Sequence, residues 1–558
     1  MKMKCRLSYI LTMLLLLFSC VKEEEKPIVD TLMPAQNATI YGEVTCNGVP
    51  VSGVVVSDGV VCGRTDGKGV YNLKSAKRNG LVFISVPSGY VTPYNGTTVP
   101  SFWKSLKKQK DEPERVDFTL KAENQDRYTM LFMGDIHLYS NKSISCFNST
   151  FIPEINSYVS SPVSGPVYAS TLGDMTWDWY WYNGDKIGIE QYIPNVNNIR
   201  GLQIYNTVGN HDNDMQYNSL QEFQMTGEDR TCMNHYRRLQ GPTCFSYNIG
   251  GVHYVSLDNV ITTNTGGTTD KDSRGCWRGV TESDMRWLEQ DLSYVSEDTP
   301  VVVSVHMPLF NMKGKPTAGN SKSINYTVQD ITAPFRKFGK VLFISAHTHL
   351  LYNTEDYDVS GLKVTEWNNG ALCGNFWTTA VKSEHKLNLC TDGTPGGYRI
   401  LTVDNGKISS LYKGIGKKKN YLFRAYDRNQ MNLEASKLGS YTKGEITGVN
   451  KDNWIYINVW DYKPSWKITV QEFVTNSATT LEVSRMEECY DPLYMLMYAQ
   501  GETDTTPQLT CTMFRAKANS ATSMVTIRVE DEFGNSRMER MQRPKKFTVD
   551  VYADELTE

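Results

Sequence analysis

Five apolar segments in the middle of the chain each end in a short motif that contains aspartate, asparagine or histidine. The segments are 128–133, 167–172, 204–208, 301–305 and 341–345, and the motifs after them are Gly134-Asp135-Ile136-His137, Gly173-Asp174, Gly209-Asn210-His211-Asp212, His306-Met307-Pro308 and Ala346-His347-Thr348-His349. Apolar runs of this length are typical of buried strands. In layered α/β sheets, ligands bind at the carboxyl ends of the strands. The pattern therefore predicts a layered domain that gathers these polar side chains at one edge.

Length and charge set the limits of what such a chain can be. At 558 residues it has room for about three or four domains. Its 58 basic and 61 acidic residues give a net charge of −3, so no overall positive field favours binding to nucleic acid. The hydrophobic share of 40% excludes a wholly disordered chain, and the mean hydropathy of −0.42 argues against a multi-pass membrane protein.

The first twenty residues resemble a bacterial export signal. Lys2, Lys4 and Arg6 precede the apolar run 11–18, which is too short to span a bilayer comfortably. The sequence Leu17-Phe18-Ser19-Cys20 resembles the lipobox of bacterial lipoproteins, which implies removal of the signal and a lipid on Cys20. An ordinary cleaved signal or a short anchor is the alternative. The charged tether that follows resembles the surface-export signal of Bacteroidota lipoproteins, so we expect an outer-membrane lipoprotein, either periplasmic or surface-exposed.

Cysteines are numerous but carry no recognisable chemistry. Ten lie between Cys46 and Cys511, an even number that permits disulfides in an exported protein. The local pairs worth testing are Cys46 with Cys62, Cys232 with Cys244, Cys373 with Cys390, and Cys489 with Cys511. Because no CxxC pair occurs, neither a thiolate zinc cluster nor a thioredoxin-type centre is indicated.

Strand-rich zones flank the central domain. Glycine-broken, valine-rich runs between 37 and 122 predict a small β-sandwich and resemble carboxypeptidase-regulatory or transthyretin-like modules. Residues 405–558 are again strand-rich and contain no histidine, which favours a second β-rich domain. We therefore expect a signal peptide at 1–20, a tether at 21–36, a β-sandwich at 37–122, the central domain at 125–404 and a C-terminal β-domain at 405–558.

Two further patterns describe the central domain. Thr281-Glu282-Ser283-Asp284 resembles a capping box in front of a helix that carries Trp287, Leu288 and Leu292 on one face. Segments 244–249 and 252–257, on either side of Gly250-Gly251, predict a hairpin. We therefore expect the sheets to be mixed.

Seven side chains from the five motifs can act as metal ligands. Asp135 and His137 are two residues apart at a strand end, which places both on one side, and His347 and His349 repeat this spacing. The full set is Asp135, His137, Asp174, Asn210, His306, His347 and His349. Mixed imidazole and carboxylate ligands suit Mn, Fe, Zn or Co better than Ca or Mg. Each motif alone is a weak signal, but five of the 8 histidines of the chain fall within the five motifs, namely His137, His211, His306, His347 and His349.

The ordered series resembles the calcineurin-like metallophosphoesterase family, whose pattern is Asp-x-His, Gly-Asp, Gly-Asn-His-Asp/Glu, His and Gly-His-x-His. The match covers nearly all of 128–403, with Ala346 where glycine is usual. Segments 369–374 and 392–398, together with the three-part layout, resemble exported bacterial phosphoesterases with β-domains at both ends. The resemblance implies an α+β or α/β fold in which mixed β-sheets, flanked by helices, form a four-layer sandwich.

Carried over residue by residue, the resemblance implies two adjacent divalent or trivalent ions of Mn, Fe or Zn. Asp135, His137, Asp174 and His349 would hold one, and Asp174, Asn210, His306 and His347 the other, with Asp174 as the bridge. Such a pair generates a hydroxide that attacks phosphorus. The implied substrate is a small organic phosphate monoester or diester. His211 would protonate the leaving oxygen, with Asp178 orienting it; a structural hydrogen bond in the loop is the alternative for His211.

Departures from the family pattern disfavour three kinds of phosphoesterase, namely protein Ser/Thr phosphatases, purple acid phosphatases and 5′-nucleotidases. Met175-Thr176-Trp177-Asp178 lacks the arginine of protein Ser/Thr phosphatases, and Trp177 stands where purple acid phosphatases place a tyrosine ligand. A 5′-nucleotidase would usually bring a different C-terminal domain.

The aromatic run after Asp174 has two interpretations. Trp177 and Trp179 either stack on a flat leaving group or simply pack the loop. Asn375 and Trp377 are further candidates to face the same pocket. A non-catalytic surface lipoprotein that binds a glycan or a protein is the alternative function, but the complete ligand set favours an enzyme. The sequence does not predict an oligomeric state.

Overall fold

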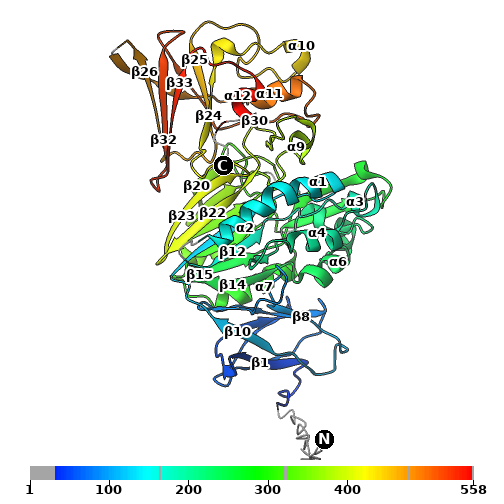
Figure 1. The fold of residues 1–558 in the computed structure, drawn as a ribbon. Helices are drawn as coiled ribbons and strands as arrows, with labels where there is room; N and C mark the ends of the chain where they lie inside the picture. The colour runs from blue at the N-terminus through cyan, green and yellow to red at the C-terminus, as the bar shows by residue number, and fades with distance from the viewer. Residues whose placement is uncertain are drawn as a thin grey trace, which may run out of the picture.

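The computed structural model describes residues 32–553 except 162–164, 318, 320–324 and 476, together with Glu555. The predicted signal peptide, Cys20 and most of the tether lie outside the described residues. Figure 1 shows three regions along one axis, with the N-terminal strands at one end, a mixed α/β body in the middle and a second strand-rich region at the other end. Across the described ranges, no helix has the length and apolar character needed to cross a bilayer.

The N-terminal region consists of two small sheets, as the valine-rich pattern predicts. One contains β1 (Ile40–Cys46), β2 (Val49–Pro50), β5 (Val70–Leu73), β7 (Tyr90–Val91), β9 (Glu114–Arg115) and β10 (Phe118–Ala122). The other contains β3 (Val55–Ser57), β4 (Cys62–Arg64), β6 (Leu81–Ser85) and β8 (Trp103–Ser105). Most of the charged stretch 104–115 forms a loop before the last strand.

Two mixed sheets form the central body. The first has the order β13-β12-β11-β22-β23, formed by β13 (Gln203–Tyr205), β12 (Val167–Thr171), β11 (Arg127–Met133), β22 (Gly397–Asp404) and β23 (Lys407–Gly414). The second has the order β14-β15-β18-β19-β21-β20, formed by β14 (Phe245–Ile249), β15 (Val252–Ser256), β18 (Val301–Ser304), β19 (Lys340–Ser345), β21 (Leu362–Asn368) and β20 (Tyr352–Val359). β11 to β13 are parallel, and so are β18 and β19, which brings the motifs that follow them to the same sheet ends.

Alternation along β11 explains the four layers. Leu131 and Met133 pack against the helical side, whereas Met130 and Phe132 belong to the core between the sheets. The helical side comprises α1 (Asn141–Cys146), the π-helix η1 (Phe147–Phe151), α2 (Ile152–Ser160), α4 (Ile189–Val196) and α6 (Arg230–Gln240). Against the second sheet lie α7 (Glu282–Ser293), α8 (Val328–Thr332) and η4 (Ala333–Phe338). The expected fold class is confirmed.

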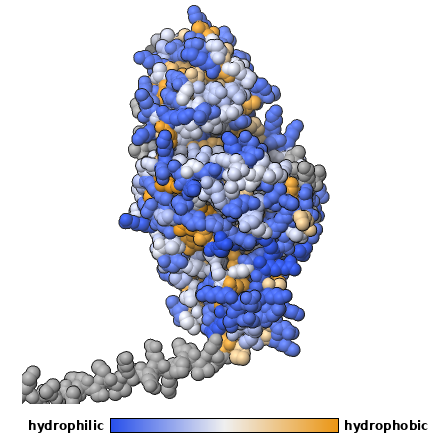
Figure 2. Space-filling model, turned by 90° about the vertical axis from the view of Figure 1, so that its right-hand side faces the viewer, coloured by the Kyte–Doolittle hydropathy of each residue, from blue (hydrophilic) through white to orange (hydrophobic). Residues whose placement is uncertain are grey.

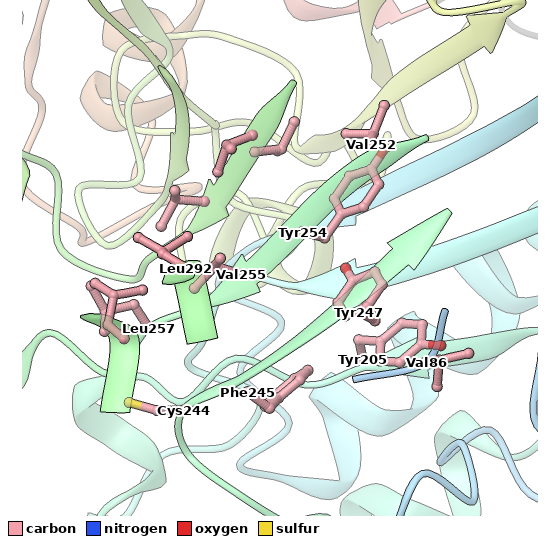
Figure 3. Packing of buried hydrophobic residues seen from close by; sticks show 14 of the residues in the cluster. Val86, Tyr205, Cys244, Phe245, Tyr247, Val252, Tyr254, Val255, Leu257 and Leu292 are labelled. Atoms are coloured by element: carbon pink, nitrogen blue, oxygen red, sulfur yellow. The ribbon is translucent and has the colours of Figure 1, made fainter. Parts of the chain in front are cut away.

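Aromatic rings fill part of the space between the two sheets. Tyr205 of the first sheet stacks on Tyr247 of the second with ring centroids 3.7 Å apart, and Tyr247 stacks on Tyr254 at 5.2 Å (Figure 3). Much of the tyrosine abundance in this region is thus core packing. On the surface, Figure 2 shows a mostly hydrophilic face on which hydrophobic residues appear in small patches.

The local predictions for the central body hold. Thr281 accepts a hydrogen bond from the Asp284 backbone at 3.1 Å and caps α7, which buries Trp287, Leu288 and Leu292. β14 and β15 form the expected hairpin. The central domain does not end at residue 404 as expected. β22 ends there, but it forms a hairpin with β23, which therefore belongs to the same sheet. Asn405 and Gly406, both at positive φ, make the tight turn of this hairpin, a typical hairpin signal that we had placed at a domain boundary.

The C-terminal region is a two-sheet sandwich. Its sheets have the orders β24-β25-β31-β28 and β27-β26-β32-β33, with β24 (Phe423–Asp427), β25 (Trp454–Val459), β31 (Met513–Lys517), β28 (Val483–Arg485), β27 (Ser477–Leu481), β26 (Lys467–Val474), β32 (Met524–Glu530) and β33 (Ser536–Gln542). Both sheets share one apolar core. Beside it lie α10 (Ala435–Leu438), α11 (Pro492–Ala499), α12 (Val549–Ala553) and the short pair β29 (Cys489–Tyr490) and β30 (Leu509–Thr510). All ten cysteines from Cys46 to Cys511 are free, so the disulfide pairs considered above are not formed.

Candidate metal centre

The five motifs meet at the carboxyl ends of the central strands. Asp135 and His137 follow β11, Asp174 follows β12, His306 follows β18, and His347 and His349 follow β19. Asn210 opens the 3₁₀ helix η2 (Asn210–Asp212) after β13. Donor atoms of Asp135, His137 and Asp174 lie within 4.8 Å of one another, as do those of Asp174, His306 and His347. Asp174 belongs to both groups, which is the geometry expected of a bridging ligand.

The backbone of this site is strained. Five of the seven predicted ligands have a positive φ: Asp135 at 51°, His137 at 46°, Asp174 at 54°, His347 at 70° and His349 at 54°. Such conformations cost roughly 1–3 kcal/mol each and persist only where the surroundings hold them. Here the turns hold one another, because the backbone N–H of Asp135 donates to Gly173 and that of His137 donates to Asp174. Ala346 is not among the residues with positive φ, so alanine fits where the family usually has glycine.

Two glycines allow the motifs to touch. A Cβ on Gly173 would lie 2.6 Å from Nδ1 of His306, and φ there is +90°. A Cβ on Gly209 would lie 2.3 Å from the backbone nitrogen of Asp174. Neither position has room for a side chain, which explains why glycine precedes the polar residue in both motifs.

His306 shows that one half of the site fits a cation. Its Nδ1 donates to the carbonyl oxygen of Leu172 at 2.7 Å, which leaves Nε2 to face Oδ1 of Asn210 at 2.9 Å and Oδ2 of Asp174 at 3.2 Å. In the neutral ring, a lone pair would therefore point at two acceptor oxygens. Burial lowers the pKa of His306, but the negative charge of Asp174 outweighs it and raises the pKa to about 9. Either a proton or a metal ion must sit at this nitrogen.

The other half repeats this arrangement. Nδ1 of His349 donates to the carbonyl oxygen of Gly374 at 2.8 Å, and its Nε2 lies 3.2 Å from Nε2 of His137 and 3.5 Å from Oδ1 of Asp135. Burial lowers the pKa of His137 to about 3, so this imidazole is neutral and able to bind metal. Oδ1 of Asp135 is buried without a hydrogen-bond partner. Converging lone pairs and an orphaned carboxylate oxygen are the features expected of a metal-ligand set.

His211 lies beside Asp174. Its backbone N–H donates to Oδ1 of Asp174 at 2.8 Å, and its Nδ1 is 2.9 Å from Oδ1 of the buried Asp178. Asp178 also forms an ion pair with Arg274, whose Nη1 is 2.6 Å from the same oxygen and whose Nη2 reaches the carbonyl of Asn210 at 3.4 Å. We had not predicted Arg274. It lies on β17 (Arg274–Arg278), which pairs with β16 (Val260–Asn264), and no local motif marks it.

A cavity of about 470 Å³ opens onto this site. Its lining includes the aromatic residues Trp177, Trp179 and Tyr180, and also Lys271, Asp272, Arg274, Gly275 and Cys276. His211, Asn210 and His347 also line it. Trp179 begins the short helix α3 (Trp179–Tyr182), and the ring of Trp177 packs 5.1 Å from that of His211. The structure therefore places both predicted aromatic residues beside the metal ligands.

Asn375 and Trp377 are not brought to this cavity. Both are buried, because the loop that carries them turns inward before α9 (Thr378–Lys382). Nε1 of Trp377 donates to the carbonyl of Ile136 at 2.9 Å. Phe376, between them, is the residue that approaches the site: its ring lies 4.4 Å from that of His349 and 4.9 Å from that of His137. The sequence predicts no role for Phe376, because a phenylalanine beside a tryptophan carries no local signal that says which of the two faces a site.

Comparison with known proteins identifies matches at both ends of the chain. The family model described as the N terminal of calcineurin-like phosphoesterase matches residues 38–123, and the one described as the C terminal of calcineurin-like phosphoesterase matches residues 366–536. No protein of curated function matches.

Among solved structures, that of PhoD is 10% identical, with a TM-score of 0.35, and the match covers 65% of this chain and 79% of PhoD. Phosphopantetheinyl hydrolase from Mycobacterium tuberculosis is 12% identical, with a TM-score of 0.25, over 44% of this chain and 91% of that chain. The 5′-nucleotidase from Candida albicans is 13% identical, with a TM-score of 0.27, over 52% and 51%. At these scores none of the three assigns a substrate to this chain.

Proposed function

We propose that the chain is a calcineurin-like phosphoesterase that uses a pair of metal ions to hydrolyse esters of phosphate. The models of the N terminal and the C terminal of that family, which match residues 38–123 and 366–536, support this proposal. One observation carries the proposal: two groups of buried N and O donors share Asp174 beside a cavity of about 470 Å³. This arrangement provides two adjacent cation sites with room for a small organic phosphate next to them.

Each predicted ligand has a place in this proposal. Asp135, His137, Asp174 and His349 would hold one ion, and Asp174, Asn210, His306 and His347 the other. When bound, a pair of divalent or trivalent Mn, Fe or Zn ions supplies Lewis acidity and makes a water molecule acidic enough to ionise near neutral pH. The carbonyls of Leu172 and Gly374 fix the rings of His306 and His349, because each accepts the Nδ1 proton and leaves Nε2 toward the ions.

His211 is placed to move a proton during the reaction. Its Nδ1 is bonded to Asp178, so Nε2 is the ring nitrogen left to protonate the leaving oxygen. Arg274 binds both Asp178 and the carbonyl of Asn210. It therefore fixes the position of the partner of His211 relative to a metal ligand. Trp177 and Trp179 would pack against the organic part of the ester, with a flat leaving group stacking best.

Removing the metal tests the proposed function directly. We expect the chain dialysed against a chelator to lose hydrolysis of phosphate monoesters and diesters, and to recover it when Mn²⁺, Zn²⁺ or Fe²⁺ is returned but not when Ca²⁺ is. The panel compares aryl with alkyl esters, for wild type and for Trp179→Ala. Full turnover by the chelated chain, or no turnover across the panel with any metal, would contradict the proposal, and the second result would favour the binding lipoprotein.

We also propose that the enzyme works in the cell envelope, tethered through a lipid on Cys20. The support is the apolar run 11–18 and the lipobox-like Leu17-Phe18-Ser19-Cys20. Cells fed a clickable palmitate analogue should label the wild-type chain and leave Cys20→Ala unlabelled, with the variant no longer sedimenting with membranes. An ordinary cleaved signal would instead leave both chains unlabelled.

A further inference from the structure

The loop that covers the metal ligands is held in an unfavourable backbone conformation. Gly374, Phe376 and Trp377 have φ values of 60°, 60° and 62°. Positive φ is uncommon for residues other than glycine and is an outlier for bulky side chains. Because Phe376 and Trp377 both have positive φ, the loop 374–377 needs contacts with the rest of the protein to stay in this conformation.

This loop touches the half of the site that contains His137 and His349. The carbonyl oxygen of Gly374 accepts the Nδ1 proton of His349 at 2.8 Å, and the ring of Phe376 packs on both histidines. The backbone N–H of Cys373 donates to the carbonyl of Asp135 at 3.1 Å. A shift of the loop would therefore move one ligand ring and loosen the packing on the second.

The far side of the loop is fastened to the C-terminal region. The amide of Asn375 donates to the hydroxyl of Tyr494 at 3.1 Å and to that of Thr503 at 2.9 Å. Its Oδ1 accepts from the backbone and hydroxyl of Thr379, which lies in the first turn of α9. Asn375, Tyr494 and Thr503 are all buried, so water does not compete for these bonds.

Hydrogen bonds fix the position of Tyr494 in the C-terminal region. It lies on α11, whose N-cap Asp491 accepts from the backbone of Tyr494 at 3.1 Å. The same carboxylate accepts from the hydroxyl of Tyr426 and the amide of Asn458, which come from β24 and β25. The hydroxyl that holds Asn375 is thus fixed to the sheets of the C-terminal sandwich.

We propose that the C-terminal domain is part of the active-site architecture: Asn375, Tyr494 and Thr503 are positioning residues that hold the loop 374–377 against His137 and His349. This inference rests on the proposed function for its catalytic consequence, because the loop acts through the metal ligands. Its structural consequence concerns metal affinity, which can be measured without a substrate.

Titration of the metal-free chain with Zn²⁺ tests this. Tyr494→Phe keeps the buried ring and removes only the hydroxyl, and we expect it to weaken binding of one of the two ions by about tenfold or more, as loss of an outer-shell partner does elsewhere. Asn375→Ala should do the same or more. Hydrogen–deuterium exchange in 374–377 should accelerate in both variants. The matched control is Tyr498→Phe on the same helix, for which we expect wild-type affinity.

The outcomes separate the two proposals. Wild-type Zn²⁺ affinities in both Tyr494→Phe and Asn375→Ala would overturn the positioning role. A loss of affinity together with an unchanged unfolding midpoint for Tyr494→Phe would support it, even if Asn375→Ala unfolds. If the wild-type chain binds two ions but cleaves no ester, the proposed function fails. The Zn²⁺ affinities of the wild type and the variants still test the positioning role in that case.

Discussion

Replacing Asp174 with asparagine should lower kcat for the best phosphate ester by about a thousandfold or more. Asp174 is the one residue shared by both donor groups, so its charge faces both predicted ions. Asparagine can still accept the backbone N–H of His211, which Asp174 binds at 2.8 Å, so the local turn keeps its main hydrogen bond. What is lost is the negative charge, and metal-ion stabilisation of several kcal/mol corresponds to roughly three powers of ten in rate.

Metal content and rate should be measured together for this variant. We expect Asp174→Asn to retain fewer than two ions per chain after dialysis and to keep its unfolding transition. The control is Asp358→Asn, an exposed aspartate on β20 that pairs with Lys363. Its rate and metal content should match those of the wild type. An Asp174→Asn chain with two bound ions and wild-type turnover would refute the two-ion assignment.

The part of the site that could be predicted lies close to strands with strong local patterns. Leu131, Met133 and their neighbours mark β11 as a buried strand, and its parallel pairing with β12 brings Asp135 next to Asp174, as the family resemblance implies. His211 is adjacent in sequence to a predicted ligand. Local pattern and sheet topology are sufficient for these residues, because each is within four positions of a strand end or of another motif residue.

What could not be predicted depends on contacts between distant segments. Arg274 reaches Asp178 across 96 positions, and Asn375 reaches Tyr494 across 119. Neither partner has a motif, and an asparagine that faces a pocket looks the same in sequence as one that faces a neighbouring domain. We predicted that Asn375 faces the pocket. In the structure it faces the C-terminal region instead, because α11 packs against its loop and Tyr494 binds its side chain. The same packing explains why the chain cannot be divided cleanly at 404.

A buried ion pair joins the central body to the C-terminal sandwich, and breaking it should strongly destabilise the chain. Arg399 of β22 binds Asp461 through two hydrogen bonds of 3.0 and 2.7 Å, and both side chains are fully buried. The guanidinium also donates to Asn369 and Ser410 and stacks over Trp367. Arg399→Met should therefore destabilise the chain by roughly 3–5 kcal/mol, since it leaves Asp461 buried without a counter-charge.

Thermal and denaturant unfolding measure this loss, and a second substitution identifies its cause. Arg399→Met should lower the midpoint of the transition that includes the C-terminal sandwich. Adding Asp461→Leu should restore most of the stability, because burying two apolar groups costs less than burying one unpaired charge. If the double variant is no more stable than the single one, the loss comes from packing around Trp367 rather than from the charge. The sheets of this sandwich also position α11, which holds the loop 374–377 through Tyr494. The single variant should therefore weaken Zn²⁺ binding, and the double variant should restore it.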